Sequence, residues 1–235
     1  MGVEPRNDWA MLAASALEWW DAAGVDMLVD DEVRDWRAEP SSPLPAPATV
    51  AAVAPAQLPD TLDAFVAWRL SDAAPEHAWG TPMIAPEGAV ASDLMIVVDQ
   101  PEDGAMAGGA AGRLLDAMLA AIGRTRSDVY LAALAHATPP AGRIAPDDEA
   151  RLAELARHHI ALTGARRVLI LTDQASRAIL GTSRAPLRGR LHGINHGERN
   201  FDAVASVHPR FLLRQPAHKA AAWKDLLLLT GEMRQ

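Results

Sequence analysis

The strongest constraint on the fold is a short, uninterrupted apolar run at residues 94–98, Leu-Met-Ile-Val-Val. A strand that is apolar at every position has to be covered on both faces, as in the parallel sheets of α/β proteins. Further apolar runs of strand length occupy residues 129–134, 167–172 and 202–207. Segments with helical spacing of apolar residues alternate with these runs, at 109–122, 146–163, 174–180 and 217–229. We therefore predict a three-layer α/β/α sandwich with a central, mainly parallel four-stranded sheet.

The region before this sheet has a different composition. Apolar residues at helical spacing predict a helix over residues 8–22, and a second helix is predicted over 61–70 with Thr61 as its N-cap. Between them, residues 39–59 are mostly Pro, Ala and Ser, which do not fit a packed element. We expect three parts: an N-terminal helical segment (1–38), a linker (39–60) and the α/β domain (61–235).

The composition of the 235-residue chain excludes several kinds of site and partner. It contains no cysteine, which rules out disulfides and cysteine-ligated clusters. No apolar run approaches the roughly 20 residues of a membrane span, and the first residues lack a signal-peptide pattern. The net charge of -8 argues against bulk attraction to nucleic acid, although an acidic protein can carry a local basic face. We expect a cytoplasmic monomer without a membrane partner or a metal.

Ligands of parallel α/β sheets bind beyond the carboxyl ends of the strands, so the loops there carry the candidate site residues. The first such loop begins at Asp99 and leads into a glycine-rich helix start at 108–112. An acid at this place can hold a water, and glycines allow backbone amides to approach an anion. The alternative is that the acids are merely solvated and that the glycines merely allow the helix to pack.

The last such loop carries His208 and Pro209. A lone histidine after a strand is more often structural than catalytic, but a partner at Asp99 across the same edge changes that interpretation. The carboxylate can stabilise a developing cation, and the imidazole a developing anion on a leaving group. His192 and His196 lie four residues apart, but the glycines that follow them predict a solvated loop rather than a ligand-bearing helix.

Several of these segments together resemble the uracil-DNA glycosylase superfamily, closest to the bacterial branch that holds an iron–sulfur cluster with four irons. The resemblance runs from about residue 94 to 229. It rests on the acidic-Pro loop, the Gly-Ala-Ala-Gly-Arg-Leu-Leu run at 109–115, Pro139-Pro140, Leu187-Arg188-Gly189, the His208-Pro209 tail and Trp223-Lys224-Asp225-Leu226.

The resemblance implies base-excision repair by hydrolysis of the bond between a flipped-out, deaminated base and its sugar, with DNA as the partner. Asp99 then occupies the place of the carboxylate that positions water, and His208 that of the histidine that hydrogen-bonds the departing base. The residues expected to border the base pocket or the DNA are Gln100, Pro101, Gly109, Gly112, Ala133, Pro209, Arg210 and Arg214.

The sequence departs from the family pattern at the places where this chemistry is expected. The loop that normally reads Gly-Glu-Ala-Pro-Gly is Val98-Asp99-Gln100-Pro101-Glu102 here. Aspartate withdraws the charge by about an ångström, and a misplacement of that size can cost on the order of a hundredfold in rate. The aromatic residue that stacks on uracil falls near Met106 or Ala107, and the asparagine that reads uracil falls at Ala132-Ala133.

The ligands of the cluster fall near Ala73 or Ala74, at Ala137 and at Ala153, so the cluster is expected to be absent. Two main functions stay open: a divergent glycosylase, or a DNA-binding member of the superfamily that has lost uracil recognition and turnover. A scaffold role, suggested by the acidic charge and the Pro/Ala-rich arm, is a third.

Overall fold

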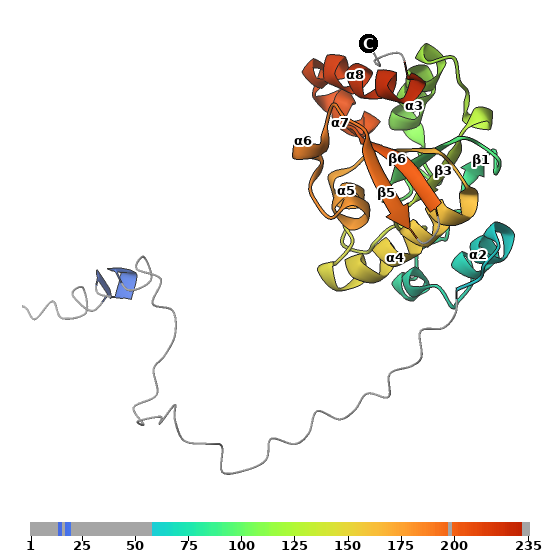
Figure 1. The fold of residues 1–235 in the computed structure, drawn as a ribbon. Coiled ribbons are helices and arrows are strands. Elements are labelled where there is room, and N and C mark those ends of the chain that lie inside the picture. The colour runs from blue at the N-terminus through green and yellow to red at the C-terminus, as the bar shows by residue number, and fades with distance from the viewer. Residues whose placement is uncertain (1–13, 16, 20–57, 197–198, 232–235) are drawn as a thin grey trace, which may run out of the picture. The chain divides into compact units, whose positions relative to one another are not determined.

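The computed structural model describes residues 14–15, 17–19, 58–196 and 199–231 (Figure 1). The chain divides into two units, residues 1–56 and 57–235. Residues 14–15 and 17–19 are helical, but the rest of the helix predicted over 8–22 and nearly all of the predicted linker lie outside the described residues. The predicted domain boundaries therefore stay a proposal.

The second unit is built on a six-stranded sheet with the order β1-β3-β2-β4-β6-β5. Its four central strands are parallel: β3 (Tyr130–Ala133), β2 (Leu94–Val98), β4 (Arg167–Ile170) and β6 (Arg199–Ala205). The mainly parallel four-stranded centre is thus confirmed. Two antiparallel edge strands that were not predicted extend the sheet to six, β1 (Glu87–Gly88) beside β3 and β5 (His192–His196) beside β6.

The prediction of a solvated loop at His192 and His196 is wrong, because both residues belong to β5. This strand pairs with β6 along its whole length, from His192 opposite Ala203 to His196 opposite Arg199. A glycine and several polar residues are tolerated there because an edge strand has one neighbour and is open to solvent on its other side.

Helices cover both faces of the sheet, so the three-layer sandwich is confirmed. One face packs against α2 (Leu62–Arg69), α4 (Pro146–Thr163) and α5 (Asp173–Leu180), the other against α3 (Gly109–Ala121), α7 (Pro209–Arg214) and α8 (Lys219–Thr230) (Figure 1). Shorter helices join them: η1 (Pro75–Trp79), η2 (Arg126–Asp128), α6 (Arg184–Leu187) and η3 (Pro216–His218). The helices expected from apolar spacing within residues 61–235 begin and end within two residues of these bounds. Thr61 stands at the N-cap of α2, but its side chain makes no capping hydrogen bond, contrary to expectation.

The strand β2 shows why its sequence is apolar at every position. All five of its residues are buried. Met95 and Val97 belong to the core on the α4 side, whereas Leu94, Ile96 and Val98 belong to the core on the α3 side. Since successive side chains of a strand point to opposite faces, a strand between two helical layers needs apolar residues throughout.

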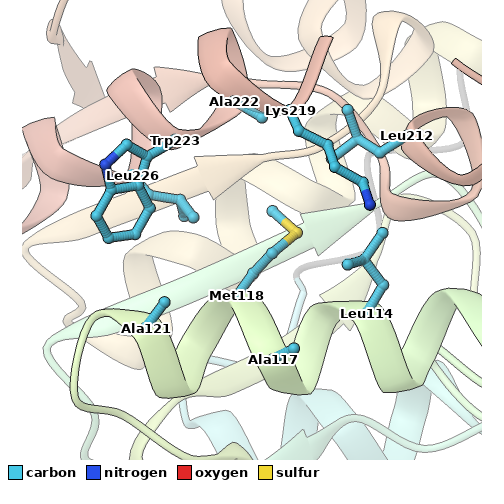
Figure 2. A pocket seen from close by; sticks show the side chains of 9 residues that line it. All are labelled: Leu114, Ala117, Met118, Ala121, Leu212, Lys219, Ala222, Trp223 and Leu226. Atoms are coloured by element: carbon cyan, nitrogen blue, oxygen red, sulfur yellow. The ribbon is translucent and has the colours of Figure 1, made fainter. Parts of the chain in front are cut away.

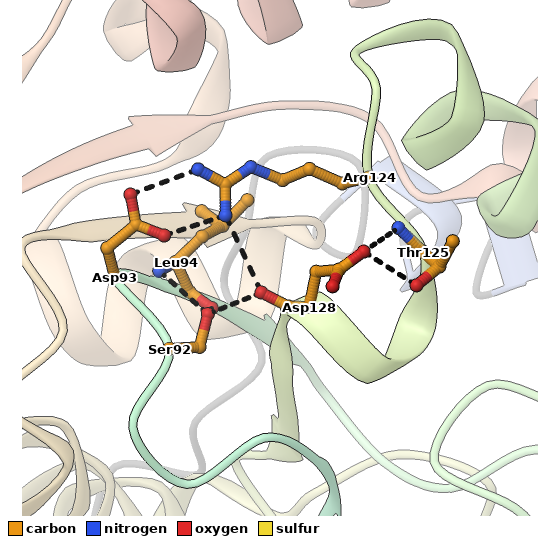
Figure 3. Close-up of polar contacts among 6 residues, drawn as sticks. All are labelled: Ser92, Asp93, Leu94, Arg124, Thr125 and Asp128. Carbon is orange, nitrogen blue, oxygen red and sulfur yellow. Dashed lines mark hydrogen bonds and ion pairs between the residues drawn. The ribbon is translucent and has the colours of Figure 1, made fainter.

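Polar contacts join the loops at the amino end of β2 (Figure 3). Arg124 donates to both carboxylate oxygens of Asp93, at 2.7 and 3.0 Å. Asp128 accepts from the backbone N–H and the hydroxyl of Thr125, while its carbonyl accepts from the Ser92 hydroxyl at 2.7 Å. These contacts hold the loops together at this edge, and the candidate residues lie at the opposite edge.

A buried ion pair joins the helices before the sheet to the end of β3. Arg69 and Glu76 are 2.6 Å apart, and their side chains are only 2% and 0% exposed. Arg69 also donates to the carbonyl of Leu134 at 2.7 Å, and Glu76 accepts from the backbone N–H of His136 at 3.0 Å. The pair therefore ties α2 and η1 to the segment that follows β3.

Among the described residues, no helix is both long enough and apolar enough to cross a bilayer.

Replacing one member of this pair should be costly. We expect Glu76→Gln to lower the free energy of unfolding by about 3 kcal/mol, because it leaves the Arg69 charge buried without its counter-ion. The matched control is Glu154→Gln, which breaks the exposed Arg151–Glu154 pair (side chains 40% and 64% exposed) and should change stability by less than about 0.5 kcal/mol. Urea unfolding of the three proteins measures the difference. Equal midpoints for the two variants would contradict this expectation.

Candidate functional site

The parallel strands bring the candidate loops to one edge of the sheet. Beyond the end of β6, the backbone N–H of Ser206 still bonds to the carbonyl of Ile170 in β4, at 2.8 Å. On the other side of β4, the loop after β2 is held in the same manner, since the carbonyl of Asp99 accepts from the N–H of Ala135 at 2.9 Å. His208 follows Ser206 by two residues, so Asp99 and His208 start from the same edge, as predicted.

His208 is a buried, neutral imidazole whose Nε2 has no hydrogen-bond partner among the described residues. It stands at the N-cap of α7, where its Nδ1 accepts a hydrogen bond from the backbone N–H of Arg210 at 3.2 Å. Burial lowers the pKa of His208 to about 4; the charge of Arg210 acts in the same direction, and Asp99 opposes both. In the neutral ring, an accepting Nδ1 places the proton on Nε2. Nε2 is buried and makes no hydrogen bond to the part of the chain that the structure describes, so its N–H is available to donate to a ligand.

Arg210 connects the two loops through its side chain. Its guanidinium forms ion pairs with Asp99, at 2.8 Å between Nη2 and Oδ2, and with Glu102, between Nη1 and Oε1. The other oxygen of Asp99 accepts from the backbone N–H of Gln100 at 3.1 Å. Burial raises the pKa of Glu102, the charge of Arg210 lowers it, and Asp99 raises it further. In this structure Arg210, expected near the DNA backbone, is thus turned toward the acids.

A tight turn fixes the backbone of Glu102. Glu102 and Ala105 exchange two backbone hydrogen bonds, of 2.9 and 3.1 Å. The two residues between them, Asp103 and Gly104, have φ angles of 49° and 77°. Asp-Gly is a favoured pair for a two-residue turn with positive φ at both positions. In the sequence Glu102 shows only as a residue in place of the glycine of the resembled pattern, and its pairing with Arg210 was not predicted.

The glycines that were expected to border the base pocket approach their own loop instead. A Cβ on Gly112 would lie 2.2 Å from the carbonyl oxygen of Ala107 and 2.8 Å from Arg126. A Cβ on Gly109 would lie 2.0 Å from the Asp103 carboxylate, and its φ of +57° also disfavours other residues. The structure therefore favours the alternative in which these glycines allow α3 to pack against the acidic loop.

The remaining candidate residues lie in different surroundings. Ala133 ends β3 and is buried in the core on the α3 side. Pro101 and Pro209 are buried, Gln100 is half-buried, and Arg214 is exposed at the end of α7. The structure thus brings together Asp99, His208 and Arg210, to which it adds Glu102.

A buried carboxylate supports the loop that carries His208. Asp225 of α8 accepts from the Ser206 hydroxyl at 2.8 Å, from the Arg188 guanidinium at 3.1 and 3.2 Å, and from the backbone N–H of Gly189 at 3.1 Å. The sequence motifs Leu-Arg-Gly at 187–189 and Trp-Lys-Asp-Leu at 223–226 therefore meet in one network. Because Ser206 precedes His208 by two residues, this network fixes the start of the loop.

An apolar groove lies apart from the candidate site. Figure 2 shows the side chains from α3, α7 and α8 that line this groove, whose volume is about 180 Å³. None of the predicted site residues lines it; its lining consists of Leu114, Ala117, Met118, Ala121, Leu212, Lys219, Ala222, Trp223 and Leu226. The candidate site is therefore defined by its polar groups and not by this groove.

The residues present do not fit the iron–sulfur cluster of the branch that the sequence resembles. The chain has no cysteine, and the ligand positions of the resembled pattern fall near Ala73 or Ala74, at Ala137 and at Ala153. Ala73 is exposed and the other three alanines are buried. In the part of the chain that the structure describes, no three His, Cys, Asp or Glu side chains are grouped to hold a metal ion.

The part of the chain that matches a known protein family includes both loops of the candidate site. The family model for the uracil DNA glycosylase superfamily matches residues 85–227, a range that contains Asp99, Glu102, His208 and Arg210. A type-4 uracil-DNA glycosylase of Pyrobaculum aerophilum is 27% identical over 178 residues, which cover 68% of this chain and 88% of that relative.

The network around Asp225 should contribute to stability through its charge. We expect Asp225→Asn to lower the free energy of unfolding by about 2 kcal/mol, since hydrogen bonds to charged groups are each worth about 1.5–3 kcal/mol. Asp202→Asn on the exposed side of β6 is the control and should have little effect. Urea unfolding distinguishes them, and a loss in both variants alike would argue against a special role of Asp225.

The lowered pKa of His208 should make its contribution to stability depend on pH. Above about pH 6.5 the ring is neutral in both the folded and the unfolded chain. Between pH 6.5 and the folded pKa of about 4, the unfolded chain binds the proton more tightly, so stability is lost as the pH falls. We expect the stability of the wild type relative to His208→Gln to decrease by up to about 1 kcal/mol per pH unit in this window. Urea unfolding at pH 7, 5.5 and 4.5 measures it, and a constant difference would contradict the neutral ring.

Proposed function

Because the chain belongs to the uracil DNA glycosylase superfamily, we propose that it hydrolyses the bond between a flipped-out base and its deoxyribose in DNA. Asp99 orients the attacking water, and His208 stabilises the departing base. The single observation that carries this proposal is the unpartnered Nε2 of a neutral His208 on the same edge as Asp99. A buried donor without a partner is unfavourable unless a ligand satisfies it.

The proposed reaction uses these groups as follows. The oxygen of a water molecule forms a bond to C1′ of the sugar while the bond from C1′ to the base nitrogen breaks. The base leaves with the electron pair of that bond, and the Nε2–H of His208 donates a hydrogen bond to the base oxygen that gains negative charge. The sugar gains positive charge in the transition state, which the carboxylate of Asp99 offsets as it takes up the proton of the water.

The choice of base follows from what the pocket lacks. Ala133 has a methyl group where the resembled pattern has an amide, and a bidentate hydrogen bond to a base is worth about 1–3 kcal/mol of discrimination. Met106 and Ala107 offer no flat ring for stacking, which is worth about 1–3 kcal/mol per base. We therefore propose a deaminated base as the substrate class without selectivity for uracil. Gln100, Pro101 and Pro209 border the site in this proposal, and Arg214 contacts the DNA backbone.

A second function has its own support. Each oxygen of Asp99 already accepts one hydrogen bond, from Gln100 and from Arg210, which leaves the carboxylate fewer sites for a water in this state. This favours the alternative that the chain binds DNA without cleaving the glycosidic bond. A salt-dependent gel shift on undamaged and damaged DNA, without strand scission, would support this function over hydrolysis.

The test of the proposed function is strand scission. Single- and double-stranded oligonucleotides with one uracil, hypoxanthine or xanthine are incubated with excess protein and then cleaved with alkali. We expect scission with at least one of these bases, and a loss on the order of a hundredfold or more in Asp99→Asn and in His208→Gln. Lys224→Gln, exposed on α8, is the control and should retain the wild-type rate. No scission at stoichiometric protein would refute hydrolysis, and full activity in His208→Gln would refute the site.

A further inference from the structure

Arg210 pairs with Asp99 and offsets its negative charge, and Glu102, which pairs with the same guanidinium, adds a second negative charge. We propose that Glu102 and Arg210 are positioning residues for Asp99: Arg210 holds the carboxylate in place, and Glu102 keeps the three-residue cluster negatively charged. This inference rests on the proposed function, because it concerns how the site meets a positively charged sugar.

Arg210 by itself would cancel the charge that Asp99 has to provide. Its Nη2 lies 2.8 Å from Oδ2 of Asp99, and a carboxylate paired with a guanidinium presents a dipole in place of a full charge. The field of a dipole falls off faster with distance than that of a charge. A site with only these two residues would have a rigid acid but little attraction for a cation.

Glu102 restores the negative charge. It forms an ion pair with the second terminal nitrogen of Arg210, so that two carboxylates share one guanidinium and the formal sum is one negative charge. The side chains of Asp99 and Glu102 are only 13% and 15% exposed, which means that solvent screens their charges weakly. The cluster therefore has the net charge of a single carboxylate, while Arg210 holds the Asp99 carboxylate in a fixed position.

The backbone keeps each member of the cluster in place. The two-residue turn at Asp103-Gly104 fixes Glu102, and the first turn of α7 fixes Arg210. The backbone N–H of Arg210 also bonds to Nδ1 of His208, so the residue that orients the acid orients the imidazole as well. One cation thus connects both sides of the proposed site, from loops more than 100 residues apart in the sequence.

Charge-changing variants test this arrangement. Glu102→Gln makes the cluster neutral, Arg210→Gln leaves two unpaired acids, and the double variant restores a single negative charge. Arg210→Lys keeps the charge but replaces the guanidinium that reaches both carboxylates. The matched control is Asp103→Asn, which removes an exposed acid one residue away, outside the ion pairs, with a side chain that tolerates the positive φ.

Two readouts are measured for each variant after its fold has been checked by circular dichroism. The first is the single-turnover rate of base removal on the preferred substrate. The second needs no turnover: it is the affinity for DNA with a cationic pyrrolidine at an abasic position, divided by the affinity for DNA with neutral tetrahydrofuran there.

We expect Glu102→Gln to lower both the rate and the preference for the cation by about tenfold or more. The double variant should recover most of the preference for the cation and part of the rate, whereas Arg210→Lys should keep the preference and lose rate. Asp103→Asn should stay within about threefold of the wild type. Recovery in the double variant cannot come from a merely structural role, because each single change removes contacts.

The two readouts separate this inference from the proposed function. A wild type that does not cleave but prefers the cation, with the same pattern among the variants, would overturn hydrolysis and support the charge balance. A wild type that cleaves while Glu102→Gln matches Asp103→Asn, or while the double variant is no better than Glu102→Gln, would overturn the charge balance. A wild type with neither cleavage nor preference would overturn both.

Discussion

The hydrogen-bond register of the four parallel strands determines where the candidate loops begin. β2 pairs with β3 on one side and β4 on the other, with Ile96 opposite both Leu131 and Leu169. A slip of one residue would exchange the residues that face α3 with those that face α4, and all five are apolar, so β2 alone does not prevent it. The register is fixed by the neighbouring segments, through backbone hydrogen bonds beyond the strand ends and through the Asp93–Arg124 ion pair at the amino end of β2. The position of Asp99 is therefore a property of the whole sheet.

Within this frame, the site is organised around a cation where two acids would otherwise repel each other. The chain carries a net charge of -8, and in the proposed function DNA would approach an edge that holds both Asp99 and Glu102. Arg210 pairs with both acids, which would reduce their repulsion of a phosphate backbone and leave one formal negative charge for the sugar of the proposed reaction. His208 needs no such partner, because burial already keeps it neutral. The imidazole is thus kept neutral by burial, whereas the acid is held in place by its ion pair with Arg210.

The sequence predicts the layers of this fold well and the contacts of the site only in part. The apolar run at 94–98 and the helical spacings after it are local signals, and they identify the four central strands and the helices around them. β1 and β5 were missed because a two-residue strand and an edge strand with glycine and polar residues have no strong pattern of their own. Asp99 and His208 could be placed on one edge because they follow parallel strands. The orientation of Arg210 toward the acids could not be predicted, since the sequence of 209–214 does not show which way the guanidinium points. One signal was available: Glu102 stands where the resembled pattern has glycine, and an additional acidic residue near a buried site suggests a basic side chain beside it.

The Asp225 network has a consequence for motion in this part of the protein. Its carboxylate connects residues 188–189, the end of β6 and α8, which are far apart in the chain but meet at one buried atom group. If any one of the three segments moved away, the buried Asp225 carboxylate would lose hydrogen bonds that no water replaces. They are expected to open together as one cooperative unit, as native-state exchange often finds for segments that share buried contacts. The backbone amide of Gly189 would then report, through its exchange with solvent, on the mobility of a loop that begins seventeen residues later in the sequence, at Ser206.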